Sequence, residues 1–110
     1  MIKVYQIQLT DEEIATINSD GEYTPRIKAS FGRSFESTFK AENFQHYNHV
    51  ANVYAADMED AFRLMNLWED ESLIERIGPC SSMSVGDILE LEDGTRYRCA
   101  SFGFTALESY

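Results

Sequence analysis

Basic residues are scarce in this chain. It contains 9 Lys and Arg against 19 Asp and Glu, which gives a formal net charge of -10 over 110 residues. A protein that binds a phosphate backbone needs a positive surface that displaces counterions. Direct binding to nucleic acid is therefore not expected.

Long apolar runs are also absent. No stretch of the sequence approaches the roughly 18 to 20 apolar residues that a transmembrane helix requires. The segment that follows Met1 lacks the apolar core of a secretion signal. We expect a soluble, cytoplasmic protein that makes no contact with a membrane.

Cysteine is limited to Cys80 and Cys99, and the two are not in CxxC spacing. In a chain of this kind such residues are more often buried thiols than zinc ligands. We expect two buried thiols, and a single disulfide between them is the alternative.

Histidine is limited to His46 and His49. Together with Glu42 and Asp57 they suggest an alternative function, a small metal-dependent enzyme, because imidazole and carboxylate suit zinc or iron. On a strand, however, positions 46 and 49 point to opposite faces. We therefore predict no catalytic, metal-binding or cofactor-binding residue, and no cofactor.

Apolar residues, by contrast, are plentiful. The sequence is 44% hydrophobic and 13% aromatic, which in a chain of this length is enough to bury one core but not two. We expect residues 1–110 to form a single domain that folds unaided despite its charge.

Two elements are predicted near the start of the chain. Alternating apolar residues favour a strand over residues 2–9. Thr10 and Glu13 then have the spacing of a capping box, in which each side chain satisfies a free backbone amide at a helix start. This predicts a short helix over residues 11–19.

The segment from Pro25 is ambiguous. Ile27, Phe31, Phe35 and Phe39 recur every four residues, which favours a helix. The same segment also fits the two-residue period of a strand. We expect a helix or irregular structure here and keep the strand as the alternative.

The middle of the chain contains the strongest helix signal. A β-prone run predicts a strand over residues 48–54, and Asp57 is a good N-cap for the apolar, helically spaced residues that follow. We predict the main helix over residues 58–68 and a short strand over residues 72–77.

The last quarter of the chain indicates a hairpin. Runs that alternate apolar with polar residues flank Asp93 and Gly94, a pair that supplies the positive φ angles of a tight two-residue turn. We predict strands over residues 86–92 and 95–102. Side chains of Ser82 or Ser84 are expected to hold the entry to this hairpin. Gly103 indicates a bulge or a close backbone approach.

These elements define the expected fold class. It is α+β, with a small, mostly antiparallel sheet, a C-terminal hairpin and one main helix packed on a face. The expected core residues are Val4, Ile7, Val53, Phe62, Met65, Ile88, Leu91, Tyr97 and Phe102.

Short sequence islands in this order resemble the YodL-like family of small domains. Residues 4–7 read VYQI, residues 53–54 run into DMEDAFRLMN at 57–66, and SMSVGD at 82–87 precedes SFGF at 101–104. The family pattern has a VYQI opening, an SLSVSD entry and a closing GF. This chain has Gly where the family often has Ser at position 86, and residues 24–47 look like its own elaboration.

The resemblance implies a context rather than a reaction. Members of that family occur in phages and mobile elements, beside proteins of plasmid transfer and antirestriction, and have no established enzymatic activity. It implies an accessory protein that binds a host or phage protein in the host-cell cytoplasm.

The acidic residues are concentrated between positions 57 and 93, where eleven acids face two arginines. Three consecutive carboxylates after Trp68 are unfavourable at a helix C-terminus. We hypothesise a non-enzymatic protein that binds a basic partner through an acidic surface, as a host-factor inhibitor or a DNA mimic. The expected contact residues are Asp57, Glu59, Asp60, Glu69, Asp70, Glu71 and Glu75.

A third possibility is a homodimer or other homo-oligomeric structural module. Phe35, Phe39, Phe44 and Tyr47 are more aromatic residues than a short peripheral segment needs. They suggest an exposed aromatic patch that mediates self-association.

Overall fold

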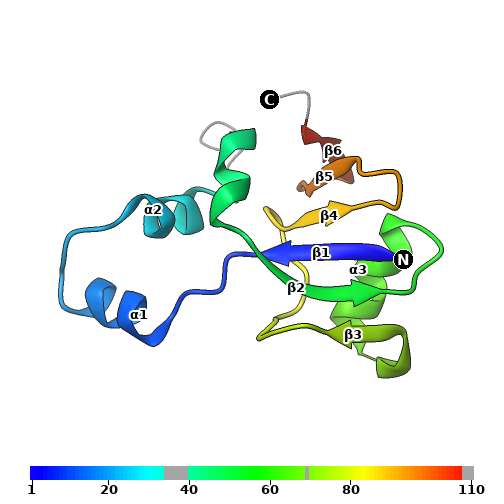
Figure 1. The fold of residues 1–110 in the computed structure, drawn as a ribbon, viewed down its shortest axis with the longest axis horizontal. Helices are drawn as coiled ribbons and strands as arrows, with labels where there is room; N and C mark the ends of the chain where they lie inside the picture. The colour runs from blue at the N-terminus through cyan, green and yellow to red at the C-terminus, as the bar shows by residue number, and fades with distance from the viewer. Residues whose placement is uncertain (34–39, 69, 108–110) are drawn as a thin grey trace.

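The computed structural model describes residues 1–33, 40–68 and 70–107. They form a six-stranded antiparallel sheet in the order β3-β2-β1-β4-β5-β6, with α3 behind it and α1 and α2 extending to one side (Figure 1). The strands are β1 (Ile2–Gln6), β2 (Asn48–Val53), β3 (Ile74–Arg76), β4 (Ile88–Glu90), β5 (Arg96–Cys99) and β6 (Phe104–Ala106). The helices are α1 (Asp11–Asn18), α2 (Pro25–Gly32) and α3 (Met58–Leu67), with 3-10 turns η1 (Ala41–His46) and η2 (Glu71–Leu73). The α+β fold class is confirmed.

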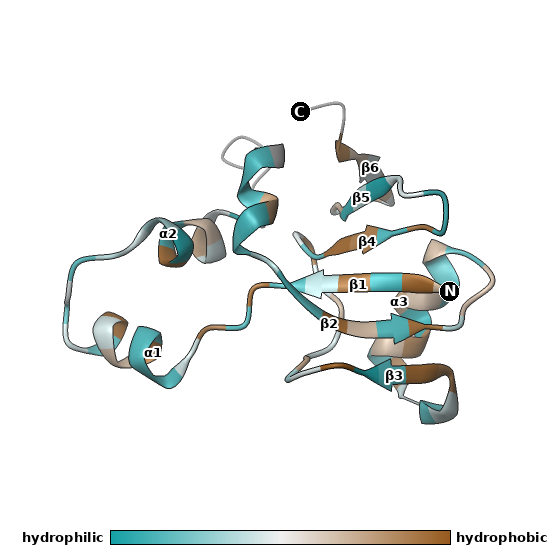
Figure 2. Cartoon of the chain, viewed as in Figure 1, coloured by the Kyte–Doolittle hydropathy of each residue, from teal (hydrophilic) through white to brown (hydrophobic). Residues whose placement is uncertain are grey.

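The main core lies between the sheet and α3. Alternate residues of β1 are buried, and α3 buries Ala61, Leu64 and Met65 at helical spacing. Hydrophobic residues mark β1, β3 and β4 in Figure 2. The buried members of this cluster are Ile2, Val4, Val50, Ala51, Val53, Ala61, Leu64, Met65, Ile74, Met83, Leu89 and Cys99.

A second, smaller core lies under α2 and η1. Its buried members are Ile7, Ala29, Tyr47, Ile88 and Leu107. Tyr5 and Phe44 pack against this cluster with their ring centroids 4.8 Å apart. The described part of the expected aromatic patch is therefore largely interior, because Tyr47 is buried and Phe44 is half-buried. Phe35 and Phe39 lie outside the described residues.

The local helix signals are confirmed. The Thr10 hydroxyl accepts from the Glu13 N–H at 3.2 Å, and the Glu13 carboxylate accepts from the Thr10 N–H at 2.8 Å. The Asp57 carboxylate caps α3 by accepting from the Asp60 N–H at 2.8 Å. The ambiguous segment from Pro25 is helical as far as Gly32.

The strand boundaries differ from the predictions. The first strand ends at Gln6 instead of residue 9, and the expected strand over 72–77 is reduced to β3. The turn at Gly94 is a three-residue loop, because the Leu91 N–H donates to the Thr95 carbonyl at 2.9 Å. Gly94 has a φ of 89° there, as a type I turn followed by a left-handed residue requires.

The C-terminal end of the chain shows the largest correction. The expected strand over 95–102 ends at Cys99, and Gly103, with a φ of 76°, belongs to a turn that leads into β6. Phe102 was expected in the core but is 97% exposed, and Phe62 is 38% exposed. Leu91 and Tyr97 are only partly buried, whereas the other expected core residues are buried.

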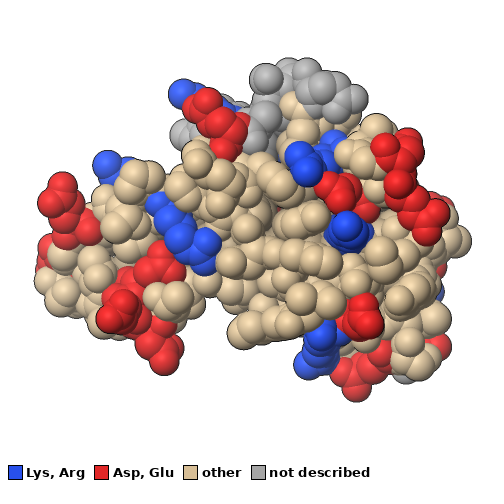
Figure 3. All heavy atoms as spheres, viewed as in Figure 1, with Lys and Arg blue, Asp and Glu red and all other residues tan. Residues whose placement is uncertain are grey.

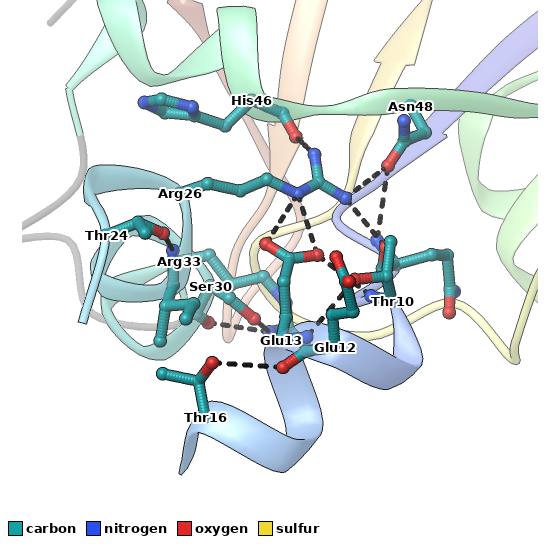
Figure 4. Close-up of polar contacts among 12 residues, drawn as sticks. Thr10, Glu12, Glu13, Thr16, Thr24, Arg26, Ser30, Arg33, His46 and Asn48 are labelled. Carbon is teal, nitrogen blue, oxygen red and sulfur yellow. Dashed lines mark hydrogen bonds and ion pairs between the residues drawn. The ribbon is translucent and has the colours of Figure 1, made fainter. Parts of the chain in front are cut away.

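Residues 7–33 and 40–47 form an arm that leaves the sheet after β1 and returns at β2 (Figure 1). Arg26 of α2 joins its parts. The Arg26 guanidinium contacts the Glu13 carboxylate, the carbonyls of Gln8 and His46, and the Asn48 side chain (Figure 4). Within the described residues, no helix combines the length and apolarity that crossing a bilayer requires.

Candidate interaction surface

The acidic residues expected to form one contact surface are divided between the two ends of α3. Asp57, Glu59 and Asp60 lie at its N-terminal end, while Asp70 and Glu71 follow its C-terminal end. A helix of ten residues is about 15 Å long. Glu75 lies on β3 near the second group, and Glu69 lies outside the described residues.

Arginines and polar groups of the same chain bind several of these acids. Arg63 contacts Asp60 at 2.6 Å, and Arg76 contacts Glu71 at 2.6 Å. The hydrogen bond from Arg63 is the largest cause that lowers the pKa of Asp60. Glu75 accepts from the Asn52 amide at 2.7 Å. Each group therefore contains one described acid that is paired with an arginine.

The visible sheet face carries no continuous acidic field. In Figure 3 the acidic side chains form separate groups over the arm, near the β4–β5 turn and around β3, with basic side chains and uncharged surface between them. Ion pairs of Glu90 with Lys3 and Arg96 lie on this face. On this face the acidic side chains are thus divided among separate groups.

Glu59 differs from the other acids near α3, because its side chain makes no hydrogen bond or ion pair with the described residues. It lies at the edge of a hollow of about 260 Å³ between α3 and the β5–β6 hairpin. We call this hollow the hairpin groove. Its lining residues are Glu59, Phe62, Cys99, Ala100, Ser101, Gly103 and Phe104.

The β5–β6 turn displays an aromatic side chain beside this groove. The Ala100 N–H donates to the Gly103 carbonyl at 2.9 Å and closes the turn. Phe102 is at its tip with 97% of its surface exposed. Burying a phenylalanine contributes about 1.5 to 3 kcal/mol, which this chain does not gain at Phe102.

The groove does not contain a reactive thiol. Burial is the main cause that raises the pKa of Cys99, to about 11, and the nearby Asp87 charge adds to it. Cys99 is therefore protonated at neutral pH and is a poor nucleophile. Both Cys80 and Cys99 are free.

The two histidines do not converge on a metal site. The His49 ring is 2.7 Å from the Asn52 side-chain oxygen and lies against Tyr5. His46 ends η1 and is not on a strand as the sequence argument assumed, and its carbonyl accepts from Arg26. Across residues 1–33, 40–68 and 70–107, no three His, Cys, Asp or Glu side chains are grouped to hold a metal ion.

A buried polar network holds the entry to β4. The Asp87 carboxylate accepts from the Gln6 amide and from the Ser84 N–H, both at 2.9 Å. Burial is the largest cause that raises the pKa of Asp87, to about 6. Ser84 takes part in this network through its backbone N–H and not through its hydroxyl. The Ser82 hydroxyl does make a side-chain hydrogen bond, because it accepts from the Trp68 indole at 3.3 Å. This network is structural.

Sequence reasoning missed the groove because it placed both Phe62 and Phe102 in the core. The overlooked signal is the β-prone run from Phe104 to Ala106 directly after Gly103. A glycine followed by such a run indicates a turn and a further strand. That interpretation places Phe102 at a turn tip.

Comparisons with known proteins do not extend this picture. No family model, curated protein or solved structure matches this chain. The resemblance to the YodL-like family therefore rests on the short sequence islands alone.

Proposed function

We propose that this domain is a protein-binding module whose contact surface consists of the hairpin groove, Phe102 and the acidic first turn of α3. The observation that carries the proposal is the exposed Phe102 beside a groove lined by Phe62 and Phe104. Aromatic side chains that are buried only on association supply much of the energy of protein interfaces.

The charges at this surface favour a basic partner. Glu59 lies at the groove, and Asp57 caps the same end of α3. The whole chain carries a net charge of -10, so a basic partner is attracted at long range. The partner we propose therefore has an apolar anchor residue with Lys or Arg nearby.

This proposal keeps protein binding but narrows the acidic surface expected from the sequence. A DNA mimic needs rows of uncompensated acids, whereas Asp60 and Glu71 are paired with arginines. The C-terminal acids are about 15 Å away along α3. We assign the contact to the N-terminal end because Glu59 and Phe62 line the hairpin groove. The likeness to the YodL-like family makes a host or phage protein the expected partner.

Site-specific photocrosslinking in cells of the natural host tests the proposal. p-Benzoylphenylalanine at Phe102 should yield a discrete adduct with one protein, identified by mass spectrometry. The matched control is the same group at Tyr54, an aromatic residue that is 51% exposed away from the groove. Only the Phe102 derivative should form the adduct, because Phe102 lies between Ser101 and Gly103, which line the groove, whereas Tyr54 is not among the lining residues.

Second-site changes complete the test. Glu59→Lys, on the exposed side of α3, should lower the adduct yield by about tenfold, the effect of losing a hot-spot contact. An indistinguishable adduct pattern from Phe102 and Tyr54, or an adduct between two copies of this chain, would contradict the proposed function.

A further inference from the structure

The two edges of the sheet differ in their chemistry. Edge strands are usually blunted by charged side chains, because a bare edge invites another strand to pair. At one edge, two of the three residues of β3, Glu75 and Arg76, are charged and exposed. At the other edge, β6 is Phe104, Thr105 and Ala106, with no charge. The β6 edge therefore lacks this protection.

We propose that the β6 edge binds an extended, basic segment of the partner as a seventh strand, with one apolar side chain of that segment in the hairpin groove. This inference rests on the proposed function and specifies the mode of binding. Strand addition of this kind takes its affinity from main-chain hydrogen bonds and its specificity from pockets for alternate side chains.

The register of the hairpin shows which backbone groups are available. Phe104 pairs with Cys99, Thr105 with Arg98, and Ala106 with Tyr97. Ala100 and Gly103 face each other and are joined by a backbone hydrogen bond, so they are a hydrogen-bonded pair of the antiparallel ladder. Hydrogen-bonded and non-hydrogen-bonded residue pairs alternate along an antiparallel ladder. Thr105 therefore bonds to β5, whereas the backbone N–H and C=O groups of Phe104 and Ala106 point away from β5. These two residues form the docking ladder.

The hairpin groove lies on the face of the sheet to which the Phe104 side chain points. The Phe104 side chain packs against the core beneath α3 and lines the hairpin groove. A residue of an added strand directly opposite Phe104 has its Cβ about 4.5 to 5.5 Å away on the same face. Its side chain would extend toward Phe62 and Glu59, and alternate side chains would point to the other face.

The negative charge of this protein favours a basic segment over a second copy of the chain as the strand that pairs with β6. A second copy of the chain would bring another net charge of -10 and place two Glu59 side chains at one interface. Like charges across an interface are strongly unfavourable. A segment with Lys or Arg beside its apolar anchor instead meets the acids of the first turn of α3. We therefore exclude pairing of two β6 edges as the function of this site.

Amide hydrogen exchange on the 15N-labelled protein tests the inference. The probe is a synthetic nine-residue peptide of alternating lysine and valine, and the matched control alternates glutamate and valine. The lysine peptide should slow exchange at the Phe104 and Ala106 amides by about tenfold, because they become hydrogen-bonded. The amides of β3 should be unchanged, and high salt should weaken the effect.

A variant at the edge separates strand addition from binding in the groove alone. Ala106→Pro removes one outward N–H, a change that an edge strand tolerates because that group makes no ladder bond. Ala106→Ser keeps the N–H and is the control. The lysine peptide should bind Ala106→Pro about tenfold more weakly than Ala106→Ser, as expected for loss of a hydrogen bond whose partner is desolvated.

Several outcomes would overturn the inference. In one such outcome, the lysine peptide shifts the NMR resonances of groove residues but does not slow amide exchange at Phe104 and Ala106, and Ala106→Pro binds it as tightly as Ala106→Ser does. Another is failure of the lysine peptide to bind although the Phe102 crosslink identifies a partner. Both leave the proposed function intact. Protection that grows with protein concentration alone would assign the edge to a second copy.

Discussion

The body and the arm of this molecule differ in how much apolar surface they bury. The body, formed by the sheet and α3, buries a contiguous apolar cluster. In the arm, α1 buries no residue at all, and α2 buries Ile27, Ala29 and Ser30. The arm is joined to the body by the small apolar cluster that includes Ala29, Tyr47 and Ile88. Arg26 adds polar contacts that reach α1, η1 and β2. Apolar burial thus dominates the body, whereas the arm combines a small core with one multiply bonded guanidinium.

The largest expected effect comes from the body. Met65→Ala should lower the free energy of unfolding by about 2 to 5 kcal/mol, because it opens a cavity between α3 and the sheet. The side chain of Met65 is fully buried. Urea denaturation followed by circular dichroism measures this change.

The matched change in the arm is Ile17→Ala on α1, where the side chain is only partly buried. It should cost less than about 1 kcal/mol, since little apolar surface leaves water there. Equal losses from the two variants would show that the comparison between body and arm is wrong.

The next effect is a pH dependence at the junction of body and arm. Burial raises the pKa of Asp87 from 3.8 to about 6. The folded state therefore binds a proton that the unfolded state releases between these values. The resulting stabilisation is fully present below about pH 4 and is lost as the pH rises through about 6, and it amounts to roughly 3 kcal/mol.

Asp87→Asn isolates this contribution, because the other carboxylates titrate alike in both proteins. The unfolding free energy of the wild type minus that of the variant should fall between pH 4 and pH 7, because only the wild type loses the contribution of Asp87. A direct check is the NMR titration of the Asp87 carboxyl carbon. A midpoint near the ordinary value of an aspartate would contradict the assignment.

Local patterns predicted the helices and strands better than their ends. The capping box at Thr10 and the N-cap at Asp57 depend on residues a few positions apart, so the sequence displays them directly. Val4, Val53 and Met65 were identified as core because their periodicity follows from one buried face. The fold class followed from the order of these elements.

The candidate site could not be predicted because it depends on distant parts of the chain. Whether Phe62 is covered depends on where the β5–β6 hairpin lies, and no local pattern encodes that distance. Gly103 by itself fits both a bulge and a turn, and the pairing of Cys99 with Phe104 shows that it is a turn. In the same way, the partners of Asp60 and Glu71 became known only from the positions of the arginine side chains.

A further small effect sharpens the description of the arm. Arg26→Lys retains the charge beside Glu13 but loses the planar fork that also reaches the Gln8 carbonyl and Asn48, at 2.7 and 2.8 Å. We expect a loss of about 1 kcal/mol, because the side chain is partly exposed and water replaces some of these bonds. The loss should appear as faster amide exchange in α1, with β1 and α3 unchanged. Uniform acceleration across the sheet would instead mean that arm and body unfold as one unit, and that Arg26 supports the whole fold.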